Sequence, residues 1–524
     1  MSFRSCAGGS QIPKLARRTS MPSSIYIHSK TFSSRLGAKA GPNIIIVGGG
    51  PSGYFTSIQL SSYLREHFPR ISPTITILES TSKPLRKVLI SGGGRCNLLP
   101  DTRKPASALL LGYPLGRGRK ELISPTSESA GVTPARVLGW FNENGVETKI
   151  EEDGRTFPIT DDSGTVRDAL EGARHREGVG LKKGVTIDEV KMDEVTGLYE
   201  VKGARRWGDG KVNFEASADA VVIATGSSQK GWDVARGLGI EVVKPVPSLF
   251  TLRLAECGGG GVLEGLQGVS VERAEVRIIP GASPAKGKGR SQKEELSQVG
   301  PILITHVGIS GPAALKTSAY GARVLAEEGY KGYVEIDWCP DVGWADVEGK
   351  LAEWKVKEGR KKFNNHSPFA SVPRRLWSNV ASSSTSGSDK LWSEVTNKEL
   401  GLAAASLKRM RLKVEGKNTN KSEFTTAGGV DTKGLEGGKF RVKGADGGKK
   451  KKMKSVGLGG EEEGGLEEKD VSEAVPRSLQ QPRVWVVGEA NNIDGITGGW
   501  NFLNCWTSGW VAGRDIGEWV VENW

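Results

Sequence analysis

The stretch Asn43-Ile-Ile-Ile-Val-Gly-Gly-Gly-Pro-Ser-Gly-Tyr-Phe55 decides the fold. Its apolar run, Ile44 to Val47, has the length of a buried strand. The run continues into Gly48, Gly50 and Gly53, which have G-x-G-x-x-G spacing. In this pattern the first glycine allows a tight turn, the second leaves room for a pyrophosphate, and the third lets helix and strand approach. The following helix would present its N–H groups to the phosphates, so the stretch predicts a dinucleotide site in a Rossmann-type fold.

A second strand and an acid follow where such a site needs them. Thr74 to Leu78 has the composition of a strand, and Glu79 closes it. A carboxylate there can accept hydrogen bonds from ribose hydroxyls, which favours an unphosphorylated ribose. Because the chain has 72 glycines, the glycine spacing alone is also compatible with a glycine-rich turn. The order strand, glycines, helix, strand and acid favours the dinucleotide site.

Length and cysteine content limit the class of protein. A chain of 524 residues suggests two to four domains. No apolar run approaches the roughly 20 residues of a membrane span, so we expect a soluble protein with no membrane partner. The cysteines are far apart and form no C-x-x-C pair, which argues against a disulfide framework, a metal site or a dithiol redox centre; they are Cys6, Cys96, Cys257, Cys339 and Cys505.

The charge of +13 is unevenly distributed. Residues 1–42 carry seven Lys and Arg and no acid, so the remainder has 13 − 7 = +6. A second basic cluster, Lys449–Lys452, is followed by the acidic Glu461–Glu463. Such charge blocks are usually solvated loops, so we expect a small-molecule substrate and consider nucleic acid an unlikely partner.

The N-terminal segment has the composition of a targeting sequence. Residues 1–42 contain nine serines and seven basic residues, without an apolar core for secretion. This favours an organellar transit peptide, for mitochondrion or plastid, and a disordered tail is the alternative.

A second glycine-rich stretch, Lys87-Val-Leu-Ile-Ser-Gly-Gly-Gly-Arg-Cys-Asn97, follows the acid. Three consecutive glycines give a loop with freely turned amides, and Arg95 adds a fixed cation. With Asn97 beside it, such a loop suits close contact with an anionic, planar ligand.

Together, the two glycine-rich stretches resemble the BaiN/aminoacetone-oxidase family of FAD-dependent oxidoreductases. The resemblance spans roughly residues 43–524, and further stretches resemble family segments in the same order. These are Gly154–Pro158 (GRTFP), Val221–Gly226 (VVIATG), Lys244–Leu249 (KPVPSL), Thr305–Pro312 (THVGISGP), Phe424–Val430 (FTTAGGV) and Val487–Asn501 (VGEANNIDGITGGWN).

The C-terminal stretch that ends in Val487–Asn501 can also be interpreted from its residues alone. Arg483 to Val487 predicts a strand that ends in Gly488-Glu489, where an acid could bind the flavin ribityl hydroxyls. Gly498-Gly499 precede a segment with helical spacing, whose N-terminus would stabilise the negative charge of a reduced flavin. A turn followed by a core helix is the alternative. Asn492 stands where the family pattern has an acid, and Asp494 follows two residues later.

The resemblance implies an α/β fold with inserts. A Rossmann-type FAD-binding domain would be built from both chain ends and interrupted by a β-rich, barrel-like insert and a small helical one. Short alternating apolar runs support the first insert, and a charged, glycine-rich stretch without periodicity predicts a disordered loop. The expected segments are 1–42 (transit peptide or tail), 43–245 (FAD-binding), 246–340 (β-rich), 341–412 (helical) and 413–524 (FAD-binding, with a disordered loop at about 434–482).

Three side chains are open to two interpretations. Cys96 could be redox-active, but no second cysteine is near, which favours a small neutral filler. His306, which the resemblance places near the flavin, is either a proton donor or structural. Lys87 either faces the flavin or forms a surface ion pair. The residues expected to bind FAD are Gly48, Gly50, Ser52, Gly53, Glu79, Lys87, Ser91, Gly92, Gly93, Gly94, Arg95, Cys96, Asn97, Thr225, Gly226, Gly488, Glu489, Asp494, Gly498, Gly499 and Asn501.

The resemblance implies a flavin enzyme whose FAD is reduced by NAD(P)H, a transient co-substrate, and passes a hydride to a small organic acceptor. Since only one dinucleotide fingerprint is convincing, an oxidase of an amine-type substrate that uses oxygen is an alternative. An RNA-modifying flavoprotein and a non-catalytic flavin-binding protein are the other two.

Overall fold

The computed structural model describes residues 41–114, 133–208, 210–280, 296–386, 389–418, 425–444 and 482–524. The predicted transit peptide therefore lies outside the described residues except for its last two positions. Most of the loop expected at 434–482 also lies outside them. Among the described residues, no helix is long and apolar enough to cross a membrane.

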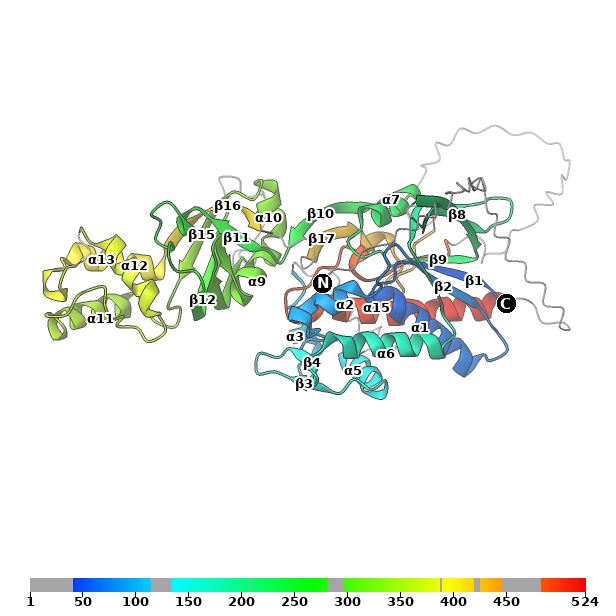
Figure 1. Ribbon diagram of the computed structural model, residues 1–524, viewed down its shortest axis with the longest axis horizontal. Coiled ribbons are helices and arrows are strands. Elements are labelled where there is room, and N and C mark those ends of the chain that lie inside the picture. The colour runs from blue at the N-terminus through cyan, green and yellow to red at the C-terminus, as the bar shows by residue number, and fades with distance from the viewer. Residues whose placement is uncertain are drawn as a thin grey trace, which may run out of the picture.

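A five-stranded parallel sheet forms the centre of the larger domain (Figure 1). Its strand order is β18-β9-β1-β2-β5, so the last strand of the chain pairs beside strands from the first half. Strands β1, β9 and β18 are nearly continuous apolar runs, as burial on both faces requires, whereas β2 alternates threonine with isoleucine and the edge strand β5 is mostly exposed. They are β1 (Asn43–Val47), β2 (Thr74–Glu79), β5 (Gly180–Lys183), β9 (Ala220–Ile223) and β18 (Val484–Val486).

Two long helices from opposite chain ends, α1 (Pro51–His67) and α15 (Trp500–Asn523), lie side by side below the sheet in Figure 1. Glycines of α15 let the backbones of the two helices approach closely. A Cβ on Gly509 would lie 3.0 Å from the Ser52 carbonyl oxygen, and one on Gly513 would lie 2.8 Å from that of Thr56. Because side chains four residues apart share one helix face, this glycine seam sets the spacing of the two helices.

Smaller elements complete this domain. Helix α6 (Ser163–Arg176) packs beside α1, and α5 (Pro134–Glu143) contacts α15. Helix α7 (Gln229–Gly237) packs on β6 of a separate antiparallel sheet. That sheet has the order β6-β7-β8, with β6 (Val185–Met192), β7 (Tyr199–Trp207) and β8 (Gly210–Ala218).

The β-rich insert is a closed six-stranded antiparallel barrel in the order β11-β14-β13-β12-β15-β16. Strand β16 (Met410–Asn418) closes it by pairing with both β11 and β15. The barrel therefore extends across the predicted boundary at residue 412. The other strands are β11 (Thr251–Leu254), β12 (Ser270–Ile279), β13 (Ser297–Ile304), β14 (Gly308–Ser310) and β15 (Gly332–Asp337).

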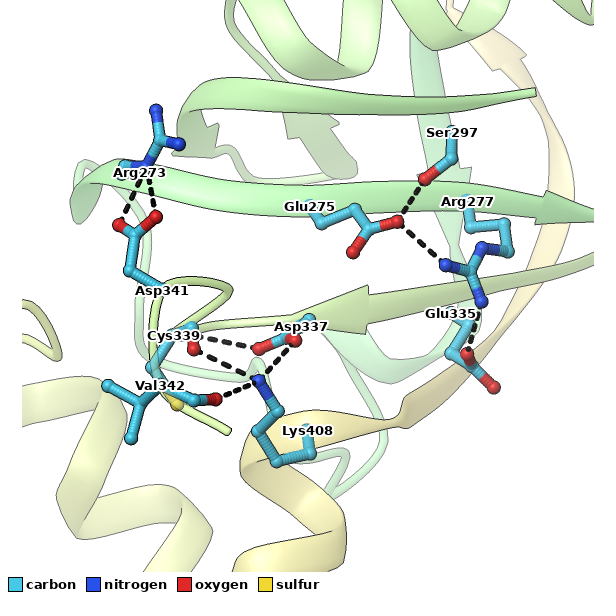
Figure 2. A network of polar contacts seen from close by, with 10 residues as sticks. All are labelled: Arg273, Glu275, Arg277, Ser297, Glu335, Asp337, Cys339, Asp341, Val342 and Lys408. Atoms are coloured by element: carbon cyan, nitrogen blue, oxygen red, sulfur yellow. Dashed lines mark hydrogen bonds and ion pairs between the residues drawn. The ribbon is translucent and has the colours of Figure 1, made fainter. Parts of the chain in front are cut away.

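Three helices between β15 and β16 form the far end of the molecule in Figure 1. They are α11 (Trp344–Lys357), α12 (Arg374–Ser384) and α13 (Asn397–Lys408). At their junction with the barrel, the Lys408 amine donates to the carbonyl oxygens of Cys339 (3.0 Å) and Val342 (2.6 Å) and pairs with Asp337 (Figure 2). One lysine thus ties the end of α13 to the end of β15.

Two strands join the barrel to the Rossmann-type domain. They are β10 (Val242–Ser248) and β17 (Thr425–Val430), which pair antiparallel. Helices α9 (Pro312–Tyr320) and α10 (Ala322–Glu327) lie on the barrel side of this joint. This architecture confirms the predicted α/β fold class, with its Rossmann-type domain from both chain ends and its β-rich and helical inserts.

The start of the predicted disordered loop is packed instead. Leu435 pairs with Val442, and Phe440 is buried in the main core. The Arg441 guanidinium lies 3.3 Å from the Glu436 carboxylate and 3.5 Å from that of Asp515. Hydrophobic burial and these ion pairs hold residues 435–444 against β18. The charged composition of the whole stretch hides this packing from sequence analysis.

Candidate cofactor site

A cavity of about 930 Å³ opens at the carboxyl ends of the parallel strands. Its volume lies near the upper end of the range for small-molecule and cofactor sites. Ligands bind at this edge in open α/β sheets. The predicted cofactor residues that line it are Gly48, Gly50, Ser52, Glu79, Lys87, Ser91, Gly92, Gly93, Asn97, Thr225, Gly226, Glu489, Gly498, Gly499 and Asn501.

The glycines of the first fingerprint have separate steric roles. Gly48 has φ +119°, and a Cβ there would lie 2.3 Å from the Ala224 carbonyl oxygen. A Cβ on Gly53 would lie 2.1 Å from the Gly48 carbonyl oxygen, so this glycine permits helix–strand packing and does not line the cavity. At Gly50 a Cβ would meet only the Ala224 oxygen, at 4.0 Å. Gly50 therefore faces open cavity, as contact with a pyrophosphate requires.

Two helix N-termini lie at this cavity, and the first N–H groups of a helix have no partner within it. Helix α1 follows Gly50, and α15 follows Gly499, which has φ +95°. Neither helix has an acid in its first turn. Each N-terminus carries roughly half a positive elementary charge, so the cavity suits an anionic ligand at both places.

The Glu79 carboxylate holds the fingerprint loop. It accepts hydrogen bonds from the Gly49 amide (2.8 Å) and from the amide and hydroxyl of Thr81 (both 2.7 Å). These contacts fix the carboxylate at the end of β2, where it lines the cavity.

An ion pair connects two motifs that are distant in sequence. Lys87, in α2 (Arg86–Ile90), pairs with the carboxylate of Glu489, in the short helix η8 (Gly488–Ala490). The lysine also donates to the Ser227 hydroxyl at 2.9 Å. Glu489 accepts a further hydrogen bond from the Thr426 amide at 3.2 Å. Lys87 and Glu489 were predicted from the sequence as cofactor-binding residues, whereas Ser227 and Thr426 were not.

The second glycine-rich stretch forms the turn η1 (Ser91–Gly94), with φ of +59° at Gly92 and +69° at Gly93. Those two glycines line the cavity, but Arg95 points elsewhere. Its guanidinium pairs with Glu151 and with Asp161 (2.7 Å) and lies 4.0 Å from the centre of the Phe157 ring. In this structure Arg95 therefore holds the neighbouring hairpin, β3 (Thr148–Ile150) and β4 (Thr156–Pro158).

Two polar atoms in the cavity wall are buried without a hydrogen-bond partner among the described residues. They are the Asn97 side-chain oxygen and the Thr225 hydroxyl. A buried polar group that stays unpaired costs about 1–3 kcal/mol. The open face of Gly50 and the two helix N-termini fit a bound dinucleotide such as FAD.

Cys96 is fully buried, and burial raises the pKa of its thiol to about 12. Its φ of +59° places it in the left-handed region, and it does not line the cavity. A neutral thiol is a poor nucleophile, so the structure favours the small neutral filler. Cys505 does line the cavity, and burial raises the pKa of its thiol to about 12 as well.

Several other predicted residues lie outside the cavity wall. His306 is exposed on the turn between β13 and β14 of the barrel. Asp494 is fully buried. The Asn492 side-chain oxygen accepts a hydrogen bond from Arg323 of α10 at 2.7 Å, which joins the two domains. The full set outside the wall is Gly53, Gly94, Arg95, Cys96, Gly488, Asp494 and His306.

The cavity also has wall residues that were not among the predicted cofactor residues. Thr186 and Ile187 come from β6, Leu249 precedes the barrel, and Arg155 comes from the β3–β4 hairpin. Cys505 had a usable signal, because it lies four residues after Asn501 on the same helix face, and Arg155 and Leu249 lie within the stretches GRTFP and KPVPSL that resemble the family. The others reach the site through long-range packing.

The chain is similar to known proteins over most of its length. The family described as "HI0933-like protein Rossmann domain" matches residues 42–515. A ribosomal RNA dihydrouridine synthase of Escherichia coli is 23% identical over 487 residues, which cover 90% of this chain and 97% of that protein. A 3-dehydro-bile acid delta(4,6)-reductase of Clostridium scindens is 24% identical over 492 residues, with 90% and 98% covered. A solved 3-ketosteroid-delta4-(5alpha)-dehydrogenase of Rhodococcus jostii has 12% identity and a TM-score of 0.41, over 92% of this chain and 99% of that one.

Proposed function

The chain belongs to the HI0933-like family of Rossmann-domain proteins, and from that premise we propose an FAD-dependent reductase that uses NAD(P)H. The acceptor in this proposal is a carbon–carbon double bond conjugated to a carbonyl. Overall, NAD(P)H gives a hydride by way of the flavin to one carbon of the double bond, and the other carbon takes a proton from water. The products are NAD(P)⁺, the saturated compound and the hydroxide left by the water.

One observation carries the proposal: the cavity at the strand ends brings both glycine-rich motifs and the C-terminal string together. Bound FAD would supply hydride acceptance and donation, which no side chain can perform. Gly50 and the N-terminus of α1 would hold its pyrophosphate. Glu79 would face the ribose, and Glu489, oriented by Lys87, would bind ribityl hydroxyls.

The N-terminus of α15 would favour the reduced cofactor. Reduction places negative charge on the flavin ring, and a positive dipole end stabilises that charge. Gly498 and Gly499 leave this end of the helix at the cavity. His306 lies outside the wall, so we assign the proton to water that reaches the open cavity.

The names of the relatives support the choice of acceptor. A dihydrouridine synthase and a bile acid delta(4,6)-reductase are both named for adding hydrogen across carbon–carbon double bonds. In uridine and in an unsaturated ketone, that double bond is conjugated to a carbonyl, which makes the distal carbon a hydride acceptor.

Anaerobic reduction of the purified full-length protein tests the proposal. We expect NADH or NADPH to bleach the flavin absorbance bands, and an unsaturated ketone to restore them without oxygen. If the bands persist with both nicotinamides but bleach with an amine, the protein is an oxidase of the alternative kind. If nothing bleaches them, a non-catalytic flavin protein is the better account.

A second candidate substrate is RNA, which the name of the Escherichia coli relative favours. The same hydride chemistry would then reduce a uracil ring, and the net charge of +6 that remains beyond residues 1–42 (13 − 7) would help hold the phosphate backbone. RNA that restores the bleached flavin bands, with an efficiency that falls steeply as salt rises, would favour this candidate. Restoration by a free unsaturated ketone but not by RNA would exclude it.

We also propose that residues 1–42 direct the protein to an organelle, because they are basic, serine-rich and free of acids. A fluorescent fusion of this segment should reach mitochondria or plastids. Retention in the cytosol would contradict the proposal.

A further inference from the structure

One face of α9 lies against the rim of the cofactor cavity. The Tyr320 hydroxyl donates to the Leu111 carbonyl oxygen at 2.8 Å. The next carbonyl, that of Gly112, accepts from the Ile496 amide at 2.8 Å, and Ile496 lines the cavity. Lys316 is four residues before Tyr320 and therefore shares its helix face. This face brings Lys316 from the barrel to the entrance between the two domains.

The Lys316 amine is half-buried there and has no hydrogen bond or ion pair among the described residues. Burial lowers its pKa, and the charge of Asp153 opposes that effect. Asp153 is already bound to another cation, since its carboxylate accepts from the Arg155 guanidinium at 2.6 Å. Arg155 lines the cavity, so Lys316 lies close to the cavity wall without a carboxylate of its own.

A second lysine reaches the same place from the Rossmann-type domain. Lys104 follows the second glycine-rich stretch, and its amine lies 3.8 Å from the position of a Cβ on Gly154, beside Arg155. Its charge also lowers the pKa of Lys316. Within the described part of the chain, Lys104 likewise forms no side-chain hydrogen bond or ion pair. Two like charges from different domains thus come close to each other. The acids beside them are bound to other cations, since Asp153 pairs with Arg155 and Asp101 accepts from the Arg103 guanidinium at 2.8 Å.

We propose that Lys316 and Lys104 together bind an oxyanion of the substrate, a phosphate or a carboxylate, at the entrance of the cofactor cavity. An anion between the amines would remove their repulsion and form charge-assisted hydrogen bonds to both. The pyrophosphate of a bound dinucleotide is not the anion between these lysines, because the fingerprint loop and the N-terminus of α1 provide its site. The inference rests on the proposed function and narrows its acceptor to a compound that carries an anionic group.

Titration of the full-length flavoprotein with inorganic phosphate and with acetate, at constant ionic strength, tests this site. Binding is followed by the shift in thermal unfolding temperature. We expect at least one of the two anions to bind, and Lys316→Gln and Lys104→Gln each to weaken its binding about tenfold, as the loss of one charge-assisted hydrogen bond implies. Lys398→Gln, on the exposed face of α13, is the matched control and should leave binding unchanged.

The anion that binds identifies the group: phosphate alone indicates a phosphate-bearing substrate, and acetate alone a carboxylate. No binding to the wild-type protein would overturn the proposal. An effect of only one lysine, or an equal effect of Lys398→Gln, would overturn it as well. Flavin bleaching by NAD(P)H does not need this site, so both lysine variants should still bleach. Loss of anion binding with normal bleaching therefore separates this inference from a failure of the proposed function.

Discussion

Lys87 and Glu489 are 402 residues apart in the chain and form an ion pair in the cavity wall. The lysine side chain is 45% exposed, whereas the glutamate side chain is only 12% exposed. The partly exposed lysine thus fixes a nearly buried carboxylate at the place where both motifs meet. Solvent screens such a pair, so we expect its importance to lie in orienting Glu489 rather than in stability.

The first prediction concerns this orientation. Glu489→Gln should weaken FAD binding about tenfold, because it removes a charge-assisted hydrogen bond to the ribityl chain. Lys87→Ala should weaken it less. If Lys87 acts through Glu489, the double variant should resemble Glu489→Gln alone. FAD titration of the deflavinated proteins measures all three, and additive effects would show that Lys87 contacts the cofactor independently.

Gly50→Val should abolish FAD retention without unfolding the protein. The new side chain would meet only the Ala224 oxygen, 4.0 Å from its Cβ, and would fill the cavity where the pyrophosphate is proposed to lie. Gly139→Val, in α5, is the control, since a Cβ there has no neighbour within 4 Å and does not face the cavity. Circular dichroism and flavin content report the two effects. A Gly50→Val protein that purifies with full flavin content would refute the assignment.

Replacing a glycine by alanine should destabilise the protein in the glycine seam of α15 but stabilise it on an exposed helix. In Gly513→Ala the Cβ would lie 2.8 Å from the Thr56 oxygen and 2.9 Å from the Leu60 nitrogen. Overpacking costs about 1–3 kcal/mol and helix propensity returns about 1 kcal/mol, so we expect a net loss of up to about 2 kcal/mol. Gly349→Ala, in open space on α11, should instead gain about 0.5–1 kcal/mol. Urea unfolding measures both, and a stabilised Gly513→Ala would contradict close packing of α1 on α15.

Cys96 should matter for alkaline stability and not for redox chemistry. Burial raises the pKa of its thiol from 9.0 to about 12, so the folded state holds the proton more tightly than the unfolded state. That stabilising contribution is complete below about pH 9 and is lost as the pH rises towards 12. In Cys96→Ala the free energy of unfolding should therefore fall less steeply over this range. Flavin bleaching by NAD(P)H should stay within about twofold of wild type, and loss of bleaching would assign Cys96 a redox role.

Local motifs made the parallel sheet and much of the cavity wall predictable. Gly48 and Gly53 are recognisable because a Cβ at either position would collide with neighbouring backbone, and Gly50 because a side chain there would fill the proposed pyrophosphate site. The apolar runs of β1 and β18 also identify themselves, since strands buried on both faces need no alternation. Chain order then placed Glu79 and Glu489 at the ends of their strands, where the structure has them.

Side-chain partnerships could not be predicted in the same way. Arg95 lies in the predicted loop, yet its direction depends on Glu151 and Asp161, which arrive from a separate hairpin. Strand β16 closes the barrel through pairing with β11, more than 150 residues earlier. The packing of Phe440 depends on strand β18, beyond a long charged stretch. Each of these contacts joins distant segments, and local patterns carry no information about such pairs.

The most direct test of the account is the absorbance spectrum of the purified full-length protein, with identification of any cofactor released on denaturation. The account predicts flavin bands and one FAD for each chain, held in the cavity between Gly50 and Glu489. A colourless protein that takes up no FAD on incubation would contradict it, whatever its similarity to known flavoenzymes.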